Sequence, residues 1–430
     1  MTVYPTYKDS GIEWQGQIPA HWDETLFFSV AKLKNQTGYI EEDLLSVYLD
    51  KGVIRTIDSD GKQVHKPSED LSKYQLVDIG DFVMNNQQCW RGSVGVSSFR
   101  GIVSPAYHVF ELSSSLNYRY ANYLLRDQYM VGQYKVASKG VGSIQQILYF
   151  PWFKKCLCLI PPQEEQRQIV AYLDYKSNKI NERICQIEKE LQTLSELKQA
   201  EIAAVVTRGL DPNVPMKESG IEWIGQIPAH WEVTQLRKYL RLFSDKGHPD
   251  MDLLSVTREL GVIVRDITSK EENHNFIPDD LSGYKLIQKG QFAINKMKAW
   301  QGSYGVSKYK GIVSPAYYTC ELNNIDTEYF DVAIRSQAYI GFFTKYSKGI
   351  RSGQWDLSPD ALKSIPFVEP PIVEQRAIVS YITEISEKID SYITKLKEEI
   401  NYLQEYKQRL ISDVVTGKVD VRGVEIPSEE

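Results

Sequence analysis

A tryptophan-rich segment occurs twice in this chain, as KDSGIEWQGQIPAHW at residues 8–22 and as KESGIEWIGQIPAHW at residues 217–231. Thirteen of the fifteen positions are identical, and the two copies start 209 residues apart. Further matches follow in the same order at offsets of 209 or 210, among them DLLSV, GIVSPAY, SKG and PP-x-x-EQR. A long repeat that is present only twice predicts a duplicated pair of domains rather than a solenoid.

The composition is that of an ordinary globular protein, with 430 residues of which 42% are hydrophobic and 25% charged. No apolar run is long enough to span a membrane and the N-terminus lacks the apolar core of a secretory signal, so we expect no membrane contact. The five cysteines are odd in number and scattered, which argues against a disulfide framework. Cys156 and Cys158 are predicted to be buried thiols in a strand. These features favour the cytoplasm.

Each half of the chain divides into two kinds of sequence. About the first 160 residues of each half are rich in Gly, Tyr, Val and Ile, with short apolar runs between turn signals that predict strands. Residues 117–134 and 326–343 predict short amphipathic helices. The predicted fold class of each globule is therefore mixed α/β (α+β).

A long helix is predicted at the end of each half. Double prolines at 161–162 and 370–371 can stand at a helix start but not inside one, and glutamates follow where the helix dipole favours acid. Each helix can run for about 45 residues, or about 65 Å, before Gly209 and Gly417 stop it. Apolar residues recur on one narrow face, at Ile180, Ile184, Ile187, Leu191 and Leu194 and at Ile389, Ile393, Leu396, Ile400 and Leu403.

So narrow an apolar face must be covered by something. Two matched helices cover each other most simply as an antiparallel coiled coil, and the alternative is that each helix packs on its own globule. The sequence thus predicts two similar globules separated by paired helices with pseudo-two-fold symmetry. The predicted parts are a first globule at 1–160, a spacer helix at 161–209, a second globule at 210–369, a spacer helix at 370–417 and a tail at 418–430.

The net charge of −6 argues against a uniformly basic nucleic-acid binder, but the acidic residues are unevenly distributed. Residues 293–320 carry four lysines and residues 332–352 carry four Lys or Arg, and neither stretch contains a carboxylate. Residues 82–110 contain Arg91 and Arg100 and again no acid. Because the field at a binding surface is local, these stretches are candidates for contact with DNA.

The motifs of common catalytic and metal sites are absent from the sequence. There is no phosphate loop, no G-x-G-x-x-G before a helix, no H-E-x-x-H, no pair of C-x-x-C motifs and no [N/D]-P-P-[Y/F] of adenine methyltransferases. His21 and His230 are matched in the repeat, and we interpret them as structural residues packed by the adjacent tryptophan, because no second ligand accompanies them. We expect neither a catalytic residue nor a metal site in this chain.

The order of these motifs resembles that of the DNA specificity subunit of Type I restriction–modification systems. GIEW-x-GQIPAHW begins each half, PP-x-x-EQR begins each long helix, and two dissimilar globules accompany them; the resemblance covers essentially the whole chain. It implies a non-catalytic subunit whose two target-recognition domains each read half of a bipartite, asymmetric site in double-stranded DNA, and whose spacer helices dock two modification (methyltransferase) subunits. It also implies that restriction (motor–nuclease) subunits complete the full complex, and that S-adenosylmethionine, ATP and Mg²⁺ are held by the partner subunits, with no cofactor in this chain.

Loops that carry amide and cationic side chains are the predicted DNA-reading elements, because Arg or Lys can bind guanine and Asn or Gln can bind adenine. Residues that match between the copies are expected to hold phosphate or a turn, and residues that differ, such as Arg91 and Gln301, are expected to discriminate sequence. The candidates are Asn86, Gln87, Gln88, Arg91, Ser93, Lys139, Ser143, Gln145 and Gln146 in the first globule, and Lys296, Lys298, Trp300, Gln301, Ser303, Lys348, Arg351, Ser352, Gln354 and Trp355 in the second.

The near identity of the repeated segments calls for another explanation, because sequence readers should diverge whereas docking sites for two identical partners should not. We hypothesise that these segments and the helix starts dock the modification subunit, through Trp14, Trp22, Trp223, Trp231, Gln166, Arg167, Gln375 and Arg376. A structural brace anchored by the tryptophans is an equally open alternative. For the whole chain, the alternative functions are a stand-alone coiled-coil DNA-binding regulator or scaffold, and an enzyme with an unrecognised site.

Overall fold

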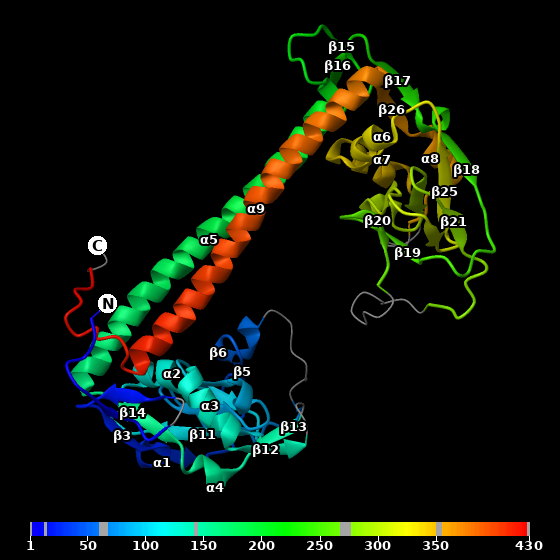
Figure 1. Ribbon diagram of the computed structural model, residues 1–430. Coiled ribbons are helices and arrows are strands. Elements are labelled where there is room, and N and C mark those ends of the chain that lie inside the picture. The colour runs from blue at the N-terminus through cyan, green and yellow to red at the C-terminus, as the bar shows by residue number, and fades with distance from the viewer. Residues whose placement is uncertain are drawn as a thin grey trace. The chain divides into compact units, whose positions relative to one another are not determined.

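The computed structural model describes residues 2–12, 15–59, 68–141, 145–266, 277–349 and 355–427. Its contacts divide the chain into two compact units (Figure 1). The first unit comprises Met1–Ile187 and Glu398–Glu430, and the second comprises Glu188–Lys397. Each unit therefore contains one globule and part of both long helices.

The first globule is built on a four-stranded antiparallel sheet with the order β4-β11-β8-β9. Phe82 on β8 pairs directly with Phe110 on β11, and both rings pack on Phe27 in the core. Five two-stranded pairings accompany this sheet: β1-β2, β3-β14, β5-β6, β7-β10 and β12-β13. The strands are β1 (Tyr7–Asp9), β2 (Gln17–Pro19), β3 (Asp23–Leu26), β4 (Ala31–Lys34), β5 (Leu45–Tyr48), β6 (Gly52–Arg55), β7 (Gln75–Val77), β8 (Phe82–Asn85), β9 (Val94–Val96), β10 (Gly101–Val103), β11 (Tyr107–Leu112), β12 (Ser138–Val141), β13 (Gln145–Leu148) and β14 (Leu157–Ile160).

The second globule repeats this plan on a sheet with the order β18-β25-β22-β23. Phe292 on β22 lies opposite Cys320 on β25 and packs edge-on against Phe330 in the core. Its smaller pairings are β15-β16, β17-β26, β19-β20 and β21-β24. The strands are β15 (Met216–Glu218), β16 (Gln226–Pro228), β17 (Glu232–Gln235), β18 (Leu240–Phe243), β19 (Leu254–Thr257), β20 (Gly261–Val264), β21 (Lys285–Ile287), β22 (Phe292–Asn295), β23 (Tyr304–Val306), β24 (Gly311–Val313), β25 (Tyr317–Leu322) and β26 (Pro366–Glu369).

Each of the two predicted amphipathic stretches forms two short helices rather than one. The break in the first globule falls at Asp127, which is extended and whose carboxylate accepts a hydrogen bond from the backbone N of Tyr129. The break in the second globule falls at Ser336, which is also extended. The short helices are α1 (Phe27–Val30), α2 (Tyr118–Arg126), α3 (Gln128–Val136), α4 (Phe150–Phe153), α6 (Thr327–Arg335), α7 (Gln337–Tyr346) and α8 (Pro359–Ser364).

The two long helices are α5 (Gln163–Arg208) and α9 (Ile372–Val415), which lie side by side in Figure 1. The apolar residues predicted to form their shared face are all buried or half-buried. The predicted antiparallel coiled coil is confirmed, because later residues of α5 meet earlier residues of α9. The pairs are Asn181 with Lys407, Arg183 with Glu399, Glu190 with Tyr392, Lys198 with Asp390 and Glu201 with Tyr381.

Each long helix contributes its start to the core of one unit and its end to the core of the other. In the first unit the globule's core contains Ile169 and Leu173 from the start of α5 and Val414 from the end of α9. In the second unit the core contains Val206 from the end of α5 and Ile378 from the start of α9. The alternative, in which each helix packs on its own globule, is therefore wrong for the whole helix. Only the start of each helix packs on the globule that precedes it in the sequence. None of the described helices is long and apolar enough to cross a membrane.

Candidate nucleic-acid interface

In the first globule, the two segments predicted to read DNA lie next to each other. The first segment is the turn between β8 and β9, which contains a 3-10 turn at Cys89–Arg91 and closes at Gly92. Gly92 has a φ of 103°, which glycine adopts without strain. The second segment is the β12-β13 hairpin. The backbone N of Leu148, at the end of β13, donates to the carbonyl O of Asn86 at 3.4 Å, so turn and hairpin form one surface.

Aromatic rings hold two cations on this surface. The Lys139 Nζ lies 3.7 Å from the ring centroid of Tyr149 and 4.5 Å from that of Trp152. The Arg91 guanidinium lies 4.6 Å from the ring centroid of Trp90. A cation placed over a ring keeps its charge while its position becomes restricted. Both cations are exposed, so this surface can meet a phosphate or a guanine with side chains that are already positioned.

The second globule forms the same arrangement with different side chains. The backbone N of Leu357 donates to the carbonyl O of Lys296 at 3.1 Å, in the positions that Leu148 and Asn86 occupy in the first globule. The Lys296 Nζ pairs with the Asp356 carboxylate at 3.0 Å, and this contact raises the pKa of Lys296. The rings of Trp300 and Trp355 lie 5.2 Å apart between centroids. Lys296, Trp300 and Trp355 of the predicted second set thus lie in two segments that contact each other.

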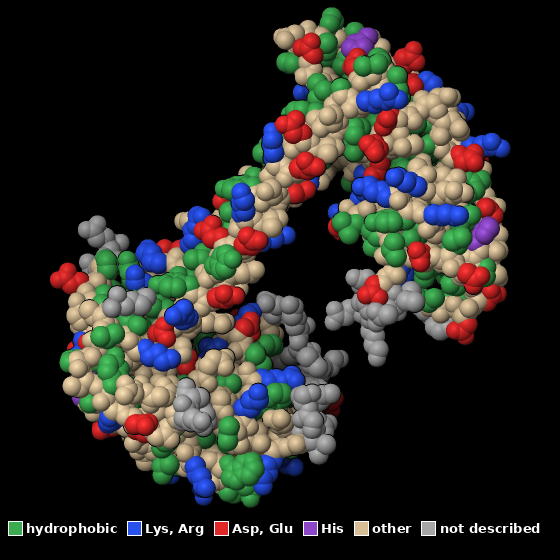
Figure 2. Space-filling view, viewed as in Figure 1, with side chains coloured by type: hydrophobic (Ala, Val, Ile, Leu, Met, Phe, Trp, Pro, Cys, Tyr) green, Lys and Arg blue, Asp and Glu red, His purple; other side chains and the backbone are tan. Residues whose placement is uncertain are grey.

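Other predicted residues lie on the same two surfaces. Lys348 is exposed, and its backbone N donates to the carbonyl O of Asp356 at 3.0 Å. Figure 2 shows several Lys and Arg side chains among hydrophobic ones on the visible face of the second globule. The remaining described candidates are exposed or half-buried: Gln87, Gln88, Gln146, Lys298 and Gln301.

Two polar atoms at these surfaces are buried without a hydrogen-bond partner among the described residues, the Asn86 Oδ1 and the Trp300 Nε1. A buried polar atom without a partner costs free energy, so such atoms are uncommon in folded proteins. Here one acceptor and one donor occur within the two segments that sequence reasoning assigned to DNA contact.

Ser93 and Ser303 are corrections to the predicted DNA-binding set. They are only 3% and 4% exposed. The Ser93 Oγ donates to the carbonyl O of Val47 at 3.0 Å, inside the globule. The two serines also close the reading turns, because their carbonyls accept hydrogen bonds from Asn85 and Asn295. They shape the turns and do not face a ligand.

Several predicted DNA-binding residues remain predictions. The backbone of Gln145 lies in β13, but the structure does not describe its side chain. Four further candidates lie outside the described residues: Ser143, Arg351, Ser352 and Gln354.

Sequence reasoning missed the aromatic residues that hold the cations, Trp90, Tyr149 and Trp152. A signal was present, because Tyr149 and Trp152 have no aromatic counterpart in the second copy, where Ser358 and Ala361 stand at the matched positions. Large side chains that differ between two copies of one frame indicate a surface where the copies differ in what they bind.

Trp22 and Trp231, predicted to contact a partner, are fully buried in the structure. The Trp22 Nε1 donates to the Glu165 carboxylate at 3.0 Å, and the Trp231 Nε1 donates to the Glu374 carboxylate at 2.8 Å. Each glutamate stands in the first turn of a long helix. Direct partner contact through these tryptophans is therefore wrong, and the structural brace describes them.

The matched histidines complete the two braces, as the sequence analysis expected of structural residues. The Nε2 of His21 lies 2.8 Å from the Glu165 carboxylate, and that of His230 lies 2.6 Å from the Glu374 carboxylate. Each brace also touches the end of the other long helix. A Cβ added to Gly417 would lie 2.2 Å from the Pro19 side chain, so this glycine permits a close approach. The repeated segment thus joins the start of one long helix to the end of the other within each unit.

Gln166 and Gln375 are also corrections to the predicted partner-binding set, because both are buried. The Gln166 Oε1 accepts a hydrogen bond from the backbone N of Asn117, and its Nε2 donates to the Pro161 carbonyl. Gln375 makes the matched contacts in the second unit. These glutamines fasten each helix start to its globule.

Three predicted partner-binding residues remain exposed. Arg167 lies 3.2 Å from the Glu164 carboxylate, and Arg376 lies 3.7 Å from the Asp326 carboxylate. Trp223 is 46% exposed, although its ring packs on Phe342 at 4.4 Å between centroids. Trp14 lies outside the described residues.

Possible metal ligands and thiols occur among the residues that the structure describes. No group of three or more His, Cys, Asp or Glu side chains there is arranged to hold a metal ion. Cys156 and Cys158 are buried, as predicted, and Cys158 lies in β14. Burial raises the pKa of the Cys156 thiol to about 12 and also raises that of Cys158, so both remain protonated thiols.

Comparisons with known proteins agree with the resemblance seen in the sequence. No protein-family model matches the chain. The chain is 22% identical over 380 residues to the Type I restriction enzyme MjaVIII specificity subunit of Methanocaldococcus jannaschii, which covers 82% of this chain and 84% of that protein.

Two solved structures share the fold. One is a chain from a structure of complex assembly and conformational transition of the type I R–M system, with a TM-score of 0.64, 15% identity, and coverage of 94% of this chain and 99% of that one. The other is the HsdS subunit from Thermoanaerobacter tengcongensis, with a TM-score of 0.51, 15% identity, and coverage of 94% and 98%.

Proposed function

The chain resembles Type I specificity subunits in sequence and fold along most of its length, and on that basis we propose that it is the DNA specificity subunit of a Type I restriction–modification complex. Each globule acts as a target-recognition domain for one half of a bipartite, asymmetric target in double-stranded DNA. The chain itself carries no catalytic residue, and it directs the chemistry of its partners.

One observation supports this assignment most directly. The reading turn and the following segment are joined by the same backbone hydrogen bond in both globules, from Leu148 to Asn86 and from Leu357 to Lys296. The side chains presented on this shared frame differ, with Arg91 and Lys139 over aromatic rings in one globule and a Trp300 pair in the other. A constant frame with changed side chains is what two readers of different half-sites need.

The coiled coil supports the partner part of the proposal. The helices α5 and α9 leave polar and charged side chains exposed along their length, and residues from their ends belong to the globule cores. We infer that two modification (methyltransferase) subunits dock there and that restriction (motor–nuclease) subunits join the full complex. S-adenosylmethionine, ATP and Mg²⁺ would then be held by those partners, and this chain would need no cofactor.

Reconstitution with a modification subunit tests the proposal. The chain alone and the modification subunit alone should transfer no labelled methyl group from S-adenosylmethionine to DNA, whereas the mixture should methylate adenine within one bipartite motif. Sequencing of the methylated sites gives both half-sites. Methylation by the partner alone with the same site pattern would contradict the proposal.

Two matched variants then test which globule reads which half-site. Arg91→Gln, which installs the residue of the second copy, should weaken discrimination at one half-site by about 5- to 150-fold, the range for losing one good bidentate contact. Lys298→Gln should do the same at the other half-site only. Each variant is the control for the other, and equal loss at both half-sites from either one would contradict separate readers.

The alternative of a stand-alone coiled-coil DNA-binding regulator or scaffold makes a different prediction. Such a protein should bind its DNA with the same affinity whether or not a modification subunit is present. A gel-shift series at one fixed salt concentration distinguishes the two functions, because electrostatic binding depends strongly on salt.

A further inference from the structure

We propose that a cavity beside Glu374 in the second unit is a socket for a tyrosine side chain carried by an extended segment of another protein. The cavity has a volume of about 230 Å³, and a cavity of about 150 Å³ already holds a benzene ring. Its wall includes Arg208, Asp211, Pro228, His230, Glu374 and Ile378.

The first unit shows what the same scaffold binds. There Tyr4 is buried, and its hydroxyl donates to the Glu165 carboxylate at 2.6 Å. Its ring lies 5.5 Å from His21 and 5.8 Å from Trp22 between centroids. The Arg422 guanidinium lies over the same ring, 4.9 Å from the centroid. The brace of the first unit is thus closed by a tyrosine.

The second unit has the same brace without the tyrosine. Glu374 bonds His230 and Trp231 in the same way as Glu165 bonds its histidine and tryptophan. The repeat places Asn213 where Tyr4 stands, and Asn213 is exposed, with its backbone N bonded to the Asp211 carboxylate. As a result, the Glu374 side chain is 40% exposed, compared with 4% for Glu165.

The chemistry of the cavity selects a phenol. A carboxylate can accept several hydrogen bonds, so Glu374 can take a third from a hydroxyl. The apolar groups of Pro228 and Ile378 suit a ring, and Arg208 in the wall can supply the cation that Arg422 supplies in the first unit. An aliphatic side chain would leave the carboxylate without this partner.

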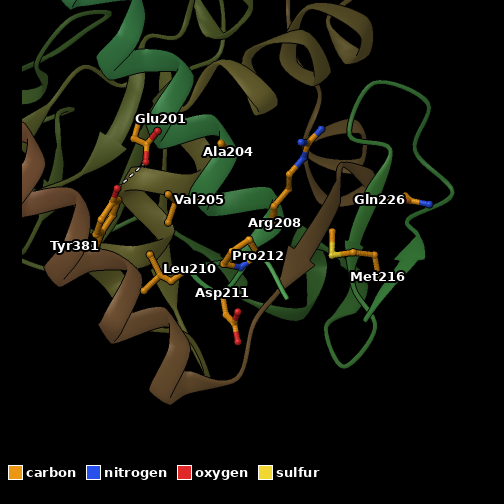
Figure 3. Close-up of a pocket in the computed structure, with 11 residues that line it drawn as sticks. Glu201, Ala204, Val205, Arg208, Leu210, Asp211, Pro212, Met216, Gln226 and Tyr381 are labelled. Carbon is orange, nitrogen blue, oxygen red and sulfur yellow. Dashed lines mark hydrogen bonds between the residues drawn. The ribbon is translucent and has the colours of Figure 1, made fainter. Parts of the chain in front are cut away.

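A neighbouring cavity gives room for the rest of the segment. It has a volume of about 720 Å³ and shares Arg208, Gly209, Leu210 and Asp211 with the socket. Figure 3 shows Leu210, Asp211 and Pro212 between the helix pair, where Tyr381 bonds Glu201, and the Met216 and Gln226 side chains of the β15-β16 hairpin.

The first unit shows one way in which a segment beside the brace is held. Tyr4 lies on a segment whose Thr2 pairs with Asp420: the Asp420 backbone N donates to the Thr2 carbonyl, and the Thr2 Oγ1 donates to the Asp420 carbonyl. Asp211 follows α5 as Asp420 follows α9, and it is exposed. The occupant is another protein rather than a second copy of this chain, because Tyr4 of each copy is already buried in its own brace.

A labelled peptide with the sequence of residues 2–8, TVYPTYK, is a suitable probe for the full-length chain. Fluorescence anisotropy should show saturable binding of one peptide per chain. Changing the peptide's first tyrosine to phenylalanine should weaken binding by about 10- to 150-fold, the range for a hydrogen bond to a charged group. Glu374→Gln in the protein should weaken binding of the unchanged peptide to a similar extent.

Two further variants make the result specific. Asn213→Tyr should fill the socket from within and abolish peptide binding, with the far-ultraviolet circular dichroism unchanged. Glu165→Gln should leave peptide binding unchanged, since it alters only the first unit. Absence of saturable binding, or equal binding to the Glu374→Gln and Asn213→Tyr variants and the parent, would overturn the proposal. A dimer in analytical ultracentrifugation that Asn213→Tyr dissociates would also overturn it, because the occupant would then be a second copy.

Discussion

Glu165 should contribute far more to the free energy of unfolding than its repeat partner Glu374. The Glu165 carboxylate accepts hydrogen bonds from Tyr4 and Trp22 and bonds His21. In Glu165→Ala, the Tyr4 hydroxyl and the Trp22 indole lose their acceptor while they stay buried. Each buried donor left unsatisfied costs about 1–3 kcal/mol, so the variant should lose about 2–6 kcal/mol. Glu374→Ala leaves one fully buried donor, Trp231, and should lose about 1–3 kcal/mol.

Urea unfolding followed by tryptophan fluorescence measures the two losses, since Trp22 and Trp231 each lie in one of the braces. The double variant Glu165→Ala with Tyr4→Phe isolates the hydrogen bond between those two residues. Tyr4→Phe alone should cost about 1.5–3 kcal/mol, but in the Glu165→Ala background it should restore about 1–3 kcal/mol, because it removes the buried hydroxyl that has lost its acceptor. Losses for the two glutamates within 0.5 kcal/mol of each other, together with additive effects of Tyr4 and Glu165, would refute the reasoning.

Further predictions concern the helix ends, the coiled coil and a buried tyrosine. Gly417→Ala should cost about 2–5 kcal/mol in a thermal or urea melt, because Gly417 has a φ of 75° and its added Cβ would overlap Pro19 at 2.2 Å. Gly209→Ala has a similar φ of 76° but a nearest contact of 3.2 Å, so it should cost only about 1 kcal/mol, and an equal cost for both would contradict this account. Ile187→Ala removes a fully buried side chain of the coiled coil and should cost about 2–5 kcal/mol, measured by urea unfolding against the exposed Glu188→Ala. Burial raises the pKa of Tyr120, so the folded chain keeps a proton that the unfolded chain releases above about pH 10; the urea midpoint should therefore fall as pH rises above 10 and fall less steeply in Tyr120→Phe.

The helical part of the fold was predictable because its signal is local. The spacing of Ile180, Ile187, Ile389 and Leu396 places them on one face, and a face that narrow is buried best against a second like it. The break at Asp127 was missed, since it depends on a side-chain cap that competes with helix continuation and not on the apolar period.

The position of the candidate DNA interface was predictable from the sequence. Which of its side chains are buried was not. Matching the two copies located the turn after β8 and the segment after α3, because both contain amide and cationic residues between glycines. The same matching could not separate Ser93, which closes the turn from inside, from Arg91 only two positions earlier. Which side chains of the turn point inward depends on how the turn packs against β5, and β5 is distant in sequence.

The brace gives a physical reason for the near identity of the repeated segments that involves no partner. Within each unit the segment must fit a helix start through Glu165 or Glu374 and a helix end at a glycine, so most of its residues are constrained from both sides.

The brace also explains one position at which the two copies differ. Gln15 is buried and its Nε2 donates to the Thr416 carbonyl at the end of α9, whereas its counterpart Ile224 is buried in an apolar core. The residue at this position therefore differs between the copies because each copy contacts the end of a different long helix. Among the described residues, a partner that recognises both copies equally must then do so through side chains that the brace leaves exposed and unchanged, such as Gln17 and Gln226.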